Sequence, residues 1–145
     1  MKRMNTSVLV VEPRLVHSLW IKPVLEIAGV QHYEIEPDPL FALDAYLSGE
    51  FDLVLAAWPF KIEGCEWITA AKSMLRETDP PVIAMLSHSG HLERRTALTH
   101  KADDIIMKPF TRRALIAVLR KHLVPALGEA NVIDLDQYRC LKNAH

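Results

Sequence analysis

Short runs of apolar residues alternate along the chain with longer segments in which apolar residues recur every three or four positions. This alternation predicts buried strands connected by helices. The runs that we interpret as strands are Ser7–Val11, His32–Glu36, Phe51–Ala57, Pro81–Leu86 and Asp104–Met107. We expect helices from Leu15 to Ala28, from the capping residue Asp38 to Ser48, from Cys65 to Arg76, from His91 to Thr99, and from the capping residue Thr111 through Leu123.

The apolar spacing also predicts which side of each helix faces the core. Pro23 in the first helix predicts a kink or a later helix start, because proline cannot donate the helical hydrogen bond. The residues that we expect on the core-facing side are Leu15, Leu19, Val24 and Ile27 in the first helix, and Leu115, Val118, Leu119 and Leu123 in the last. Phe41, Ala45 and Leu47 indicate the second helix by their spacing.

Five strands that alternate with five helices predict an α/β fold, a doubly wound five-stranded parallel sheet with helices on both faces. In such folds, ligands bind beyond the carboxyl ends of the strands. Any chemistry is therefore expected at the residues that follow the strands, which are Glu12, Pro13, Ala57, Trp58, Leu86, Ser87, Lys108 and Pro109.

Composition narrows the class of protein. The chain has 145 residues, enough for one domain with a full core. Its formal charge of −1 gives no global attraction to nucleic acid or to an anionic membrane. No stretch approaches the roughly 18 apolar residues of a membrane span, and Cys65 and Cys140 lack metal-ligand spacing. We expect a cytoplasmic protein without a disulfide framework, a metal site or a glycine-rich nucleotide loop.

Four segments together resemble the successive strands of a two-component response-regulator receiver domain of the CheY-like type. They are Val-Leu-Val-Val-Glu-Pro (8–13), Gly-Glu-Phe-Asp-Leu-Val-Leu (49–55), Pro-Val-Ile-Ala-Met (81–85) and Ala-Asp-Asp-Ile-Ile-Met-Lys-Pro-Phe (102–110). The last segment is the most specific of the four. The resemblance extends from Ser7 to Leu123 and implies a flavodoxin-like fold with strand order 2-1-3-4-5.

The chemistry of that family depends on a magnesium ion held by three carboxylates, of which one accepts the phosphoryl group. Glu12 matches the first carboxylate of the family pattern. Pro13 occupies the position of the second, and Ala57 occupies the position of the acceptor aspartate. Proline and alanine offer no ligand atom, so the resemblance implies a degenerate pseudo-receiver that takes neither phosphoryl group nor metal nor any other cofactor.

Three further positions of the family pattern can be assigned in this chain. Ser87, or Leu86 if the strand is shorter, occupies the position of the phosphate-binding hydroxyl. Ile105 occupies the position of the aromatic switch residue. Lys108 matches the family lysine and allows two interpretations: its ammonium pairs with Glu12, or it anchors a small anion or another signal in the vacated pocket.

These residues predict a stand-alone, atypical receiver that acts in two-component signal transduction as a phosphorylation-independent protein–protein module rather than as an enzyme. Its expected partners are a histidine kinase or another signalling regulator. The alternative hypothesis is a small α/β enzyme or ligand-binding protein that reuses the crevice around Glu12, Ser87 and Lys108.

The resemblance also implies a docking surface on the last two helices. Arg112, Arg113, Arg120 and Asp104 carry charges of both signs there, which suits a weak symmetric homodimer through the fourth helix, fifth strand and fifth helix. The alternative is a monomer whose ion pairs are solvated. We expect residues 1–127 to form the receiver-like domain. Residues 128–145 form a tail that is either disordered or a short amphipathic helix with Leu135, Tyr138 and Leu141 on one side.

Overall fold

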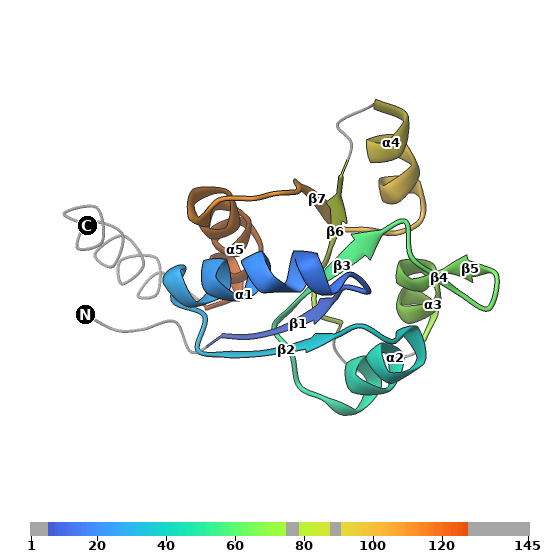
Figure 1. The fold of residues 1–145 in the computed structure, drawn as a ribbon, viewed down its shortest axis with the longest axis horizontal. Helices are drawn as coiled ribbons and strands as arrows, with labels where there is room; N and C mark the ends of the chain where they lie inside the picture. Colours follow the sequence, from blue (N-terminus) through green and yellow to red (C-terminus); the bar gives the residue numbers. More distant parts are fainter. Residues whose placement is uncertain (1–5, 75–78, 88–90, 128–145) are drawn as a thin grey trace.

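The computed structural model of the chain describes residues 6–74, 79–87 and 91–127 (Figure 1). They form a five-stranded parallel sheet with the order β2-β1-β3-β6-β7. Its strands are β1 (Ser7–Val11), β2 (His32–Glu36), β3 (Leu53–Trp58), β6 (Val82–Leu86) and β7 (Asp104–Met107). The helices are α1 (Leu15–Ile27), α2 (Pro39–Ser48), α3 (Trp67–Ser73), α4 (His91–Thr99) and α5 (Arg112–Leu127). The predicted fold class is confirmed, and the sheet order corresponds to 2-1-3-4-5.

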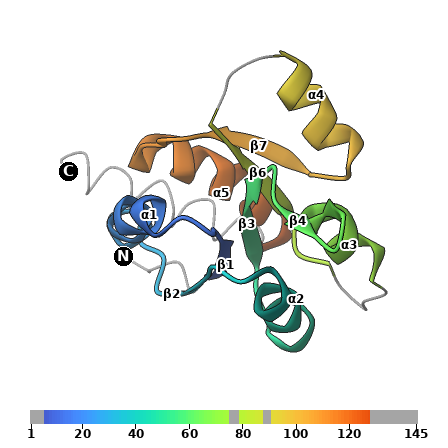
Figure 2. The same ribbon diagram turned by 45° about the vertical axis from the view of Figure 1, so that its right-hand side comes forward.

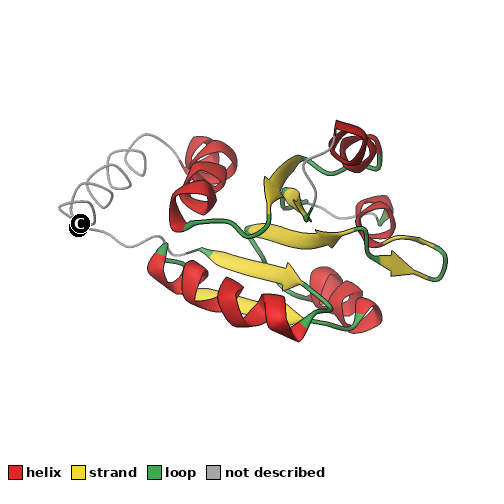
Figure 3. Cartoon of the chain, turned by 45° about the horizontal axis from the view of Figure 1, so that its top comes forward, coloured by secondary structure: helices red, strands yellow, loops and turns green. Residues whose placement is uncertain are grey.

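Helices cover both faces of the sheet, as right-handed crossovers require (Figures 2 and 3). Alternate residues of β1 point to opposite faces. Val8 and Val10 pack with α1 and α5, whereas Leu9 and Val11 pack with α2, α3 and α4. The three central strands β1, β3 and β6 are therefore buried on both sides, which explains their continuous apolar sequences.

The predicted core face was wrong for the first helix. In α1, Leu15, Leu19 and Ile27 are exposed, and the buried residues are Ile21 and Leu25. Both sides of this helix are apolar, so the spacing alone did not identify the side that meets the sheet. Pro23 is tolerated inside α1, which begins at Leu15 without a later start. Its ring lies on the exposed side of the helix.

In α2 the buried residues are Ala42 and Tyr46, which are four positions apart. Phe41 and Leu47, whose spacing indicated this helix, are exposed. Asp38 caps this helix as predicted, because its Oδ1 accepts the backbone N–H groups of Leu40 and Phe41.

The segment predicted as one helix from Cys65 to Arg76 begins instead with a strand. β4 (Lys61–Ile62) and β5 (Cys65–Glu66) form a small antiparallel hairpin, and α3 starts only at Trp67. Glu63 and Gly64 connect the two strands with positive φ angles of 47° and 84°. Two successive positive φ angles are typical of a type I′ hairpin turn. Residues 75 and 76 of the predicted helix lie outside the described residues.

The predicted core stripe of α5 is confirmed, since Leu115, Val118, Leu119 and Leu123 are all buried against β1 and β3 residues. None of the helices in the described part of the chain is long and apolar enough to cross a bilayer. The predicted amphipathic turn in the tail lies outside the described residues.

Candidate functional site

The carboxyl ends of β1, β3, β6 and β7 lie on the same side of the sheet. Four of the residues predicted for the site, Glu12, Ala57, Leu86 and Lys108, lie at these strand ends. The backbone N–H of Lys108 donates to Leu86 O over 2.7 Å, and that of Glu12 donates to Glu36 O over 3.2 Å. Ala57 lies opposite Met85 in the register of β3 and β6. Asp52 lies at the other end of β3, where its carboxylate accepts the N–H of Ser7. It is therefore too remote to replace a missing acceptor.

Glu12 is a fully buried carboxylate at this edge. Its Oε2 accepts the backbone N–H of Arg14 over 3.0 Å, and its Oε1 accepts a short hydrogen bond from Lys108 Nζ. The Lys108 side chain is only 5% exposed. A buried charge is stable only when it is paired and hydrogen-bonded. Of the two interpretations of Lys108, the ion pair with Glu12 is the one that the structure confirms.

His17 is the third member of this cluster, and sequence reasoning missed it. It lies in the first turn of α1, directly above the strand ends. Its Nδ1 is 2.9 Å from Lys108 Nζ and 3.7 Å from Glu12 Oε1. An ammonium group can only donate, so Nδ1 of the neutral ring accepts from Lys108, and the ring proton belongs on Nε2.

Burial lowers the pKa of Lys108 from its ordinary value. The hydrogen bond and the charge of Glu12 act in the opposite direction, and the nearby charge of Arg14 lowers the pKa further. The net direction is down, because desolvation of the ammonium is the largest of these effects. The lysine is thus held by one carboxylate and one imidazole in a poorly hydrated place.

The acceptor position is apolar. Ala57 is 5% exposed and belongs to the core cluster on the α1–α5 side. Trp58 is buried on the other face, where its ring centroid lies 5.5 Å from that of His100. Phe60 is half-buried and packs against both core clusters, so aromatic side chains fill the space just beyond β3.

A buried carboxylate holds the loop beyond β3 in place. Glu66 accepts the backbone N–H of Phe60 over 3.0 Å and forms an ion pair of 3.0 Å with Lys61. Trp67 N donates to Phe60 O over 2.7 Å. The loop that follows β3 is therefore fixed to the β4–β5 hairpin.

The residues present do not fit a magnesium ion. Glu12 is the one carboxylate among the family's metal-binding positions, and Lys108 already occupies one of its oxygens. Pro13 is exposed and has no ligand atom, and Ala57 has none either. Within the described ranges, no three His, Cys, Asp or Glu side chains come close enough together to hold a metal ion.

The remaining positions lie apart from this ion pair. Ser87 is exposed at the end of β6, and Ile105 on β7 is half-buried against the core cluster of the opposite face. Of the predicted docking residues on α5, Arg113 is exposed, and Arg112 and Arg120 are half-buried.

Asp104, the fourth predicted docking residue, is bound within the molecule. Its Oδ2 lies 2.8 Å from His122 Nε2 and 3.2 Å from Lys121 Nζ. Partial burial raises the pKa of its carboxyl, but hydrogen bonds from His122, from the backbone N–H of Ile105 and from Lys121 lower it more. The net pKa lies below the ordinary value. His122 was not singled out in the sequence.

No protein-family model matches the chain. Its sequence is 28% identical over 120 residues to the putative two-component response regulator ARR19 of Arabidopsis thaliana. It is 29% identical over 148 residues to the response regulator ArlR of Staphylococcus epidermidis. These alignments include 83% and 97% of this chain, but only 29% and 65% of the two relatives. The chain thus spans less than two thirds of either relative.

Solved structures share the fold. The receiver domain of the sensor histidine kinase PA1611 from Pseudomonas aeruginosa, solved with magnesium, superposes with a TM-score of 0.71, at 20% identity over 81% of this chain and 97% of that one. The receiver domain of Saccharomyces cerevisiae Ssk1, in complex with the phosphotransfer protein Ypd1, gives 0.69 at 15% identity over 84% and 91%. By its fold the chain resembles response-regulator receiver domains, and its sequence is similar to those of two-component response regulators.

Proposed function

We propose that this receiver domain works without phosphorylation, as a protein–protein module of two-component signalling. The observation that carries the proposal is the apolar acceptor position: Ala57 has no oxygen to accept a phosphoryl group, and its surroundings are apolar. A phosphoryl dianion placed there would lose its hydration without gaining a carboxylate-bound cation.

The state of Lys108 supports the same proposal. In the family, according to the resemblance, this lysine contacts the phosphate and reports its arrival. Here its ammonium is bonded to Glu12 and His17. Breaking a buried pair of this kind costs about 3–5 kcal/mol, so the lysine is already in the bonded state that phosphorylation would otherwise bring about.

The residue at the switch position, Ile105, supports the same proposal. Ile105 is aliphatic and packs against the core cluster that contains Trp58 and Ala97. It has no ring whose rotation could couple the site to the surface. We infer that the surface formed by α4, β7 and α5 has one constitutive arrangement.

Proteins are the proposed partners. The receiver domain of Ssk1 was solved with the phosphotransfer protein Ypd1, which suggests a histidine kinase, a phosphotransfer protein or another regulator as the class of partner here. We place this interaction in the cytoplasm. The alternative of an enzyme or ligand-binding protein needs polar groups that converge on a ligand, whereas Glu12 and Lys108 bond to each other.

Affinity measurements with and without a phosphoryl donor test the proposal. The tagged chain is incubated with lysate of its native cell, and each signalling protein that it retains is purified and titrated against it. We expect the same dissociation constant in the presence and absence of acetyl phosphate with magnesium. A partner that binds only after treatment of this chain with acetyl phosphate would contradict the proposal.

A further inference from the structure

Charged residues are segregated along the chain. From Pro23 to Phe60 there is no lysine or arginine, but seven carboxylates: Glu26, Glu34, Glu36, Asp38, Asp44, Glu50 and Asp52. From His91 to Lys121 eight basic residues accompany only three acidic ones; the basic residues are Arg94, Arg95, Lys101, Lys108, Arg112, Arg113, Arg120 and Lys121. The first segment contains β2, at one edge of the sheet, and the second contains β7, at the other. The fold converts a pattern in sequence into two oppositely charged edges.

The outer side of α2 forms the centre of the acidic edge. Leu40, Asp44 and Leu47 follow one another at helical spacing, and Phe41 beside them is 67% exposed. The described hydrogen bonds of the neighbouring carboxylates come from neutral donors, such as the N–H of Ser7 to Asp52. These carboxylates therefore keep their negative charge.

The outer side of α4 has the opposite charge. Arg94, Arg95 and Leu98 are exposed and lie one turn apart, and Leu92 on the same helix is 71% exposed. Like α2, this helix thus combines exposed apolar side chains with exposed charges of one sign, whereas its acidic residue Glu93 is half-buried.

The acidic residues near α4 are partly neutralised within the molecule. Asp104 binds Lys121 and His122, and Asp103 binds Lys72 of α3 over 2.9 Å. A symmetric contact through α4, β7 and α5 would consequently bring two basic surfaces together, which is unfavourable.

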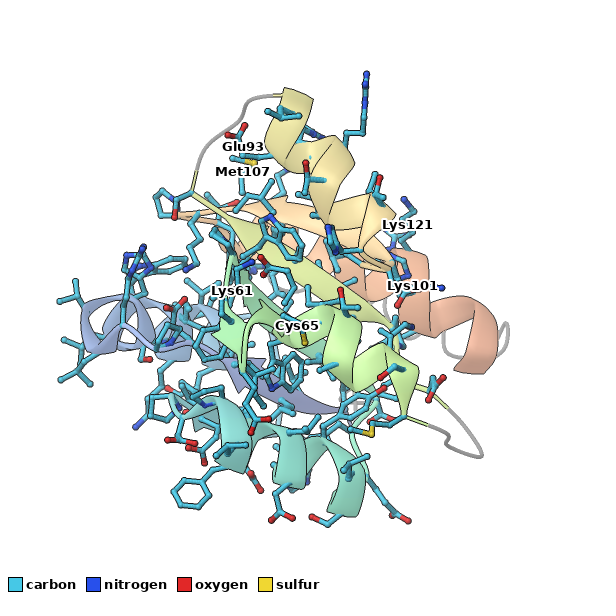
Figure 4. All side chains as sticks on the ribbon, turned by 90° about the vertical axis from the view of Figure 1, so that its right-hand side faces the viewer. Lys61, Cys65, Glu93, Lys101, Met107 and Lys121 are labelled. Carbon is cyan, nitrogen blue, oxygen red and sulfur yellow. The ribbon has the colours of Figure 1, made fainter. Side chains whose placement is uncertain are left out.

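We propose that α2 of one molecule binds α4 of a second copy of this chain in a head-to-tail contact. Both helices belong to the same layer, with α3 between them, and Figure 4 shows Lys101 and Lys121 on the α4 side, away from α2. Asp44 then meets Arg94 and Arg95, while the exposed apolar residues of the two helices bury one another. Because the two surfaces differ, the contact either repeats from molecule to molecule or closes into a two-fold dimer in which α2 of each copy binds α4 of the other. It does not depend on the proposed function.

Sedimentation velocity of the full chain with charge-reversed variants tests the contact. Asp44→Lys reverses the acidic surface, and Arg94→Glu with Arg95→Glu reverses the basic one. These side chains are exposed, so the fold tolerates the changes. At about 0.01 M salt, where the Debye length is roughly 30 Å, we expect the wild type to associate and each reversed variant to associate at least about tenfold more weakly. The variant with all three substitutions should regain association, because lysine then meets glutamate.

The second part of the experiment mixes the Asp44→Lys variant with the variant that carries Arg94→Glu and Arg95→Glu. Each associates only weakly alone, but the mixture should associate as the wild type does, because each variant then offers a complementary surface to the other. A wild type that stays monomeric at low salt would overturn the proposal. So would association that Asp44→Lys leaves unchanged while the arginine substitutions abolish it, which is the behaviour of a symmetric contact through α4. A variant whose circular dichroism spectrum differs from that of the wild type is replaced by the corresponding neutral one, Asp44→Asn or Arg94→Gln with Arg95→Gln.

Discussion

His17 Nδ1 lies 2.9 Å from Lys108 Nζ, although 91 positions separate the two residues in the sequence. The same ammonium donates to the fully buried carboxylate of Glu12. A histidine from the start of α1 and a lysine that directly follows β7 are thus joined by a hydrogen bond at the strand ends, where the resemblance places the phosphorylation site of the family.

Replacement of Lys108 by Met should destabilise the protein by about 3–5 kcal/mol, because Glu12 is left buried without its counter-charge. Glu12→Gln removes the carboxylate charge and leaves Lys108 in place. The double variant should recover part of the stability that Lys108→Met loses. Urea unfolding of the wild type and the three variants gives the coupling energy. A coupling energy of zero would contradict the buried pair.

The ion pairs of Asp104 should make stability depend on acid pH. Its pKa is lowered in the folded state, so the stabilisation is present above the ordinary carboxyl pKa and is lost as the pH falls through the folded value. We expect Asp104→Asn to cost on the order of 1 kcal/mol at pH 7. Unfolding of both proteins at pH 7 and near pH 3 checks this, since the difference should disappear in acid. A difference that is independent of pH would exclude an electrostatic origin.

The phenol of Tyr33 should lose its proton only at an unusually high pH. Partial burial, followed by the hydrogen bond and the charge of Glu26, raises the pKa of Tyr33 to about 12. Its hydroxyl donates to Glu26 Oε2 over 2.5 Å, which joins β2 to α1. Glu26→Gln should return the pKa toward about 10, as measured by phenolate absorbance with Tyr33→Phe as the reference. Stability from this bond should decline as the pH rises from about 10 toward the folded pKa.

The turn between β4 and β5 gives a local prediction. Gly64 has a φ of 84° with no atom near an added Cβ, so Gly64→Ala is strained only by its backbone conformation. The left-handed region costs an L-residue about 1–2 kcal/mol, and thermal unfolding should report a loss of that size. Glu63→Asn is the matched control and should be neutral or stabilising, because asparagine favours the first position of this turn. Equal stability of Gly64→Ala and the wild type would argue against the I′ turn.

Much of the fold could be predicted because its signals are local. The β-branched run Ser7–Val11 is buried on both sides, and such a run is typical of a central strand in a parallel sheet. The stripe of α5 was predicted correctly because the other side of that helix is polar. In α1 both sides are apolar, and Leu15 and Leu19 were assigned to the core although Ile21 and Leu25 occupy it.

The site could be predicted only in part. The absence of a carboxylate at Ala57 is a fact of the sequence, and Glu12 and Lys108 follow strands whose carboxyl ends lie on the same side of the sheet. His17 and His122 escaped notice because their partners, Lys108 and Asp104, come from other elements. One signal could have pointed to His17: the first turn of the helix after β1 lies over the strand ends. For the β4–β5 hairpin, the pair Glu63–Gly64 was the available signal.

The most direct test of the central claim is the intact mass of the wild-type chain after incubation with acetyl phosphate and magnesium. We predict no increase, and none for Ala57→Asp alone, because Pro13 still supplies no carboxylate and Lys108 remains bonded to Glu12. A mass increase of one phosphoryl group on the wild type that hydroxylamine removes, as it does from an acyl phosphate, would contradict the account.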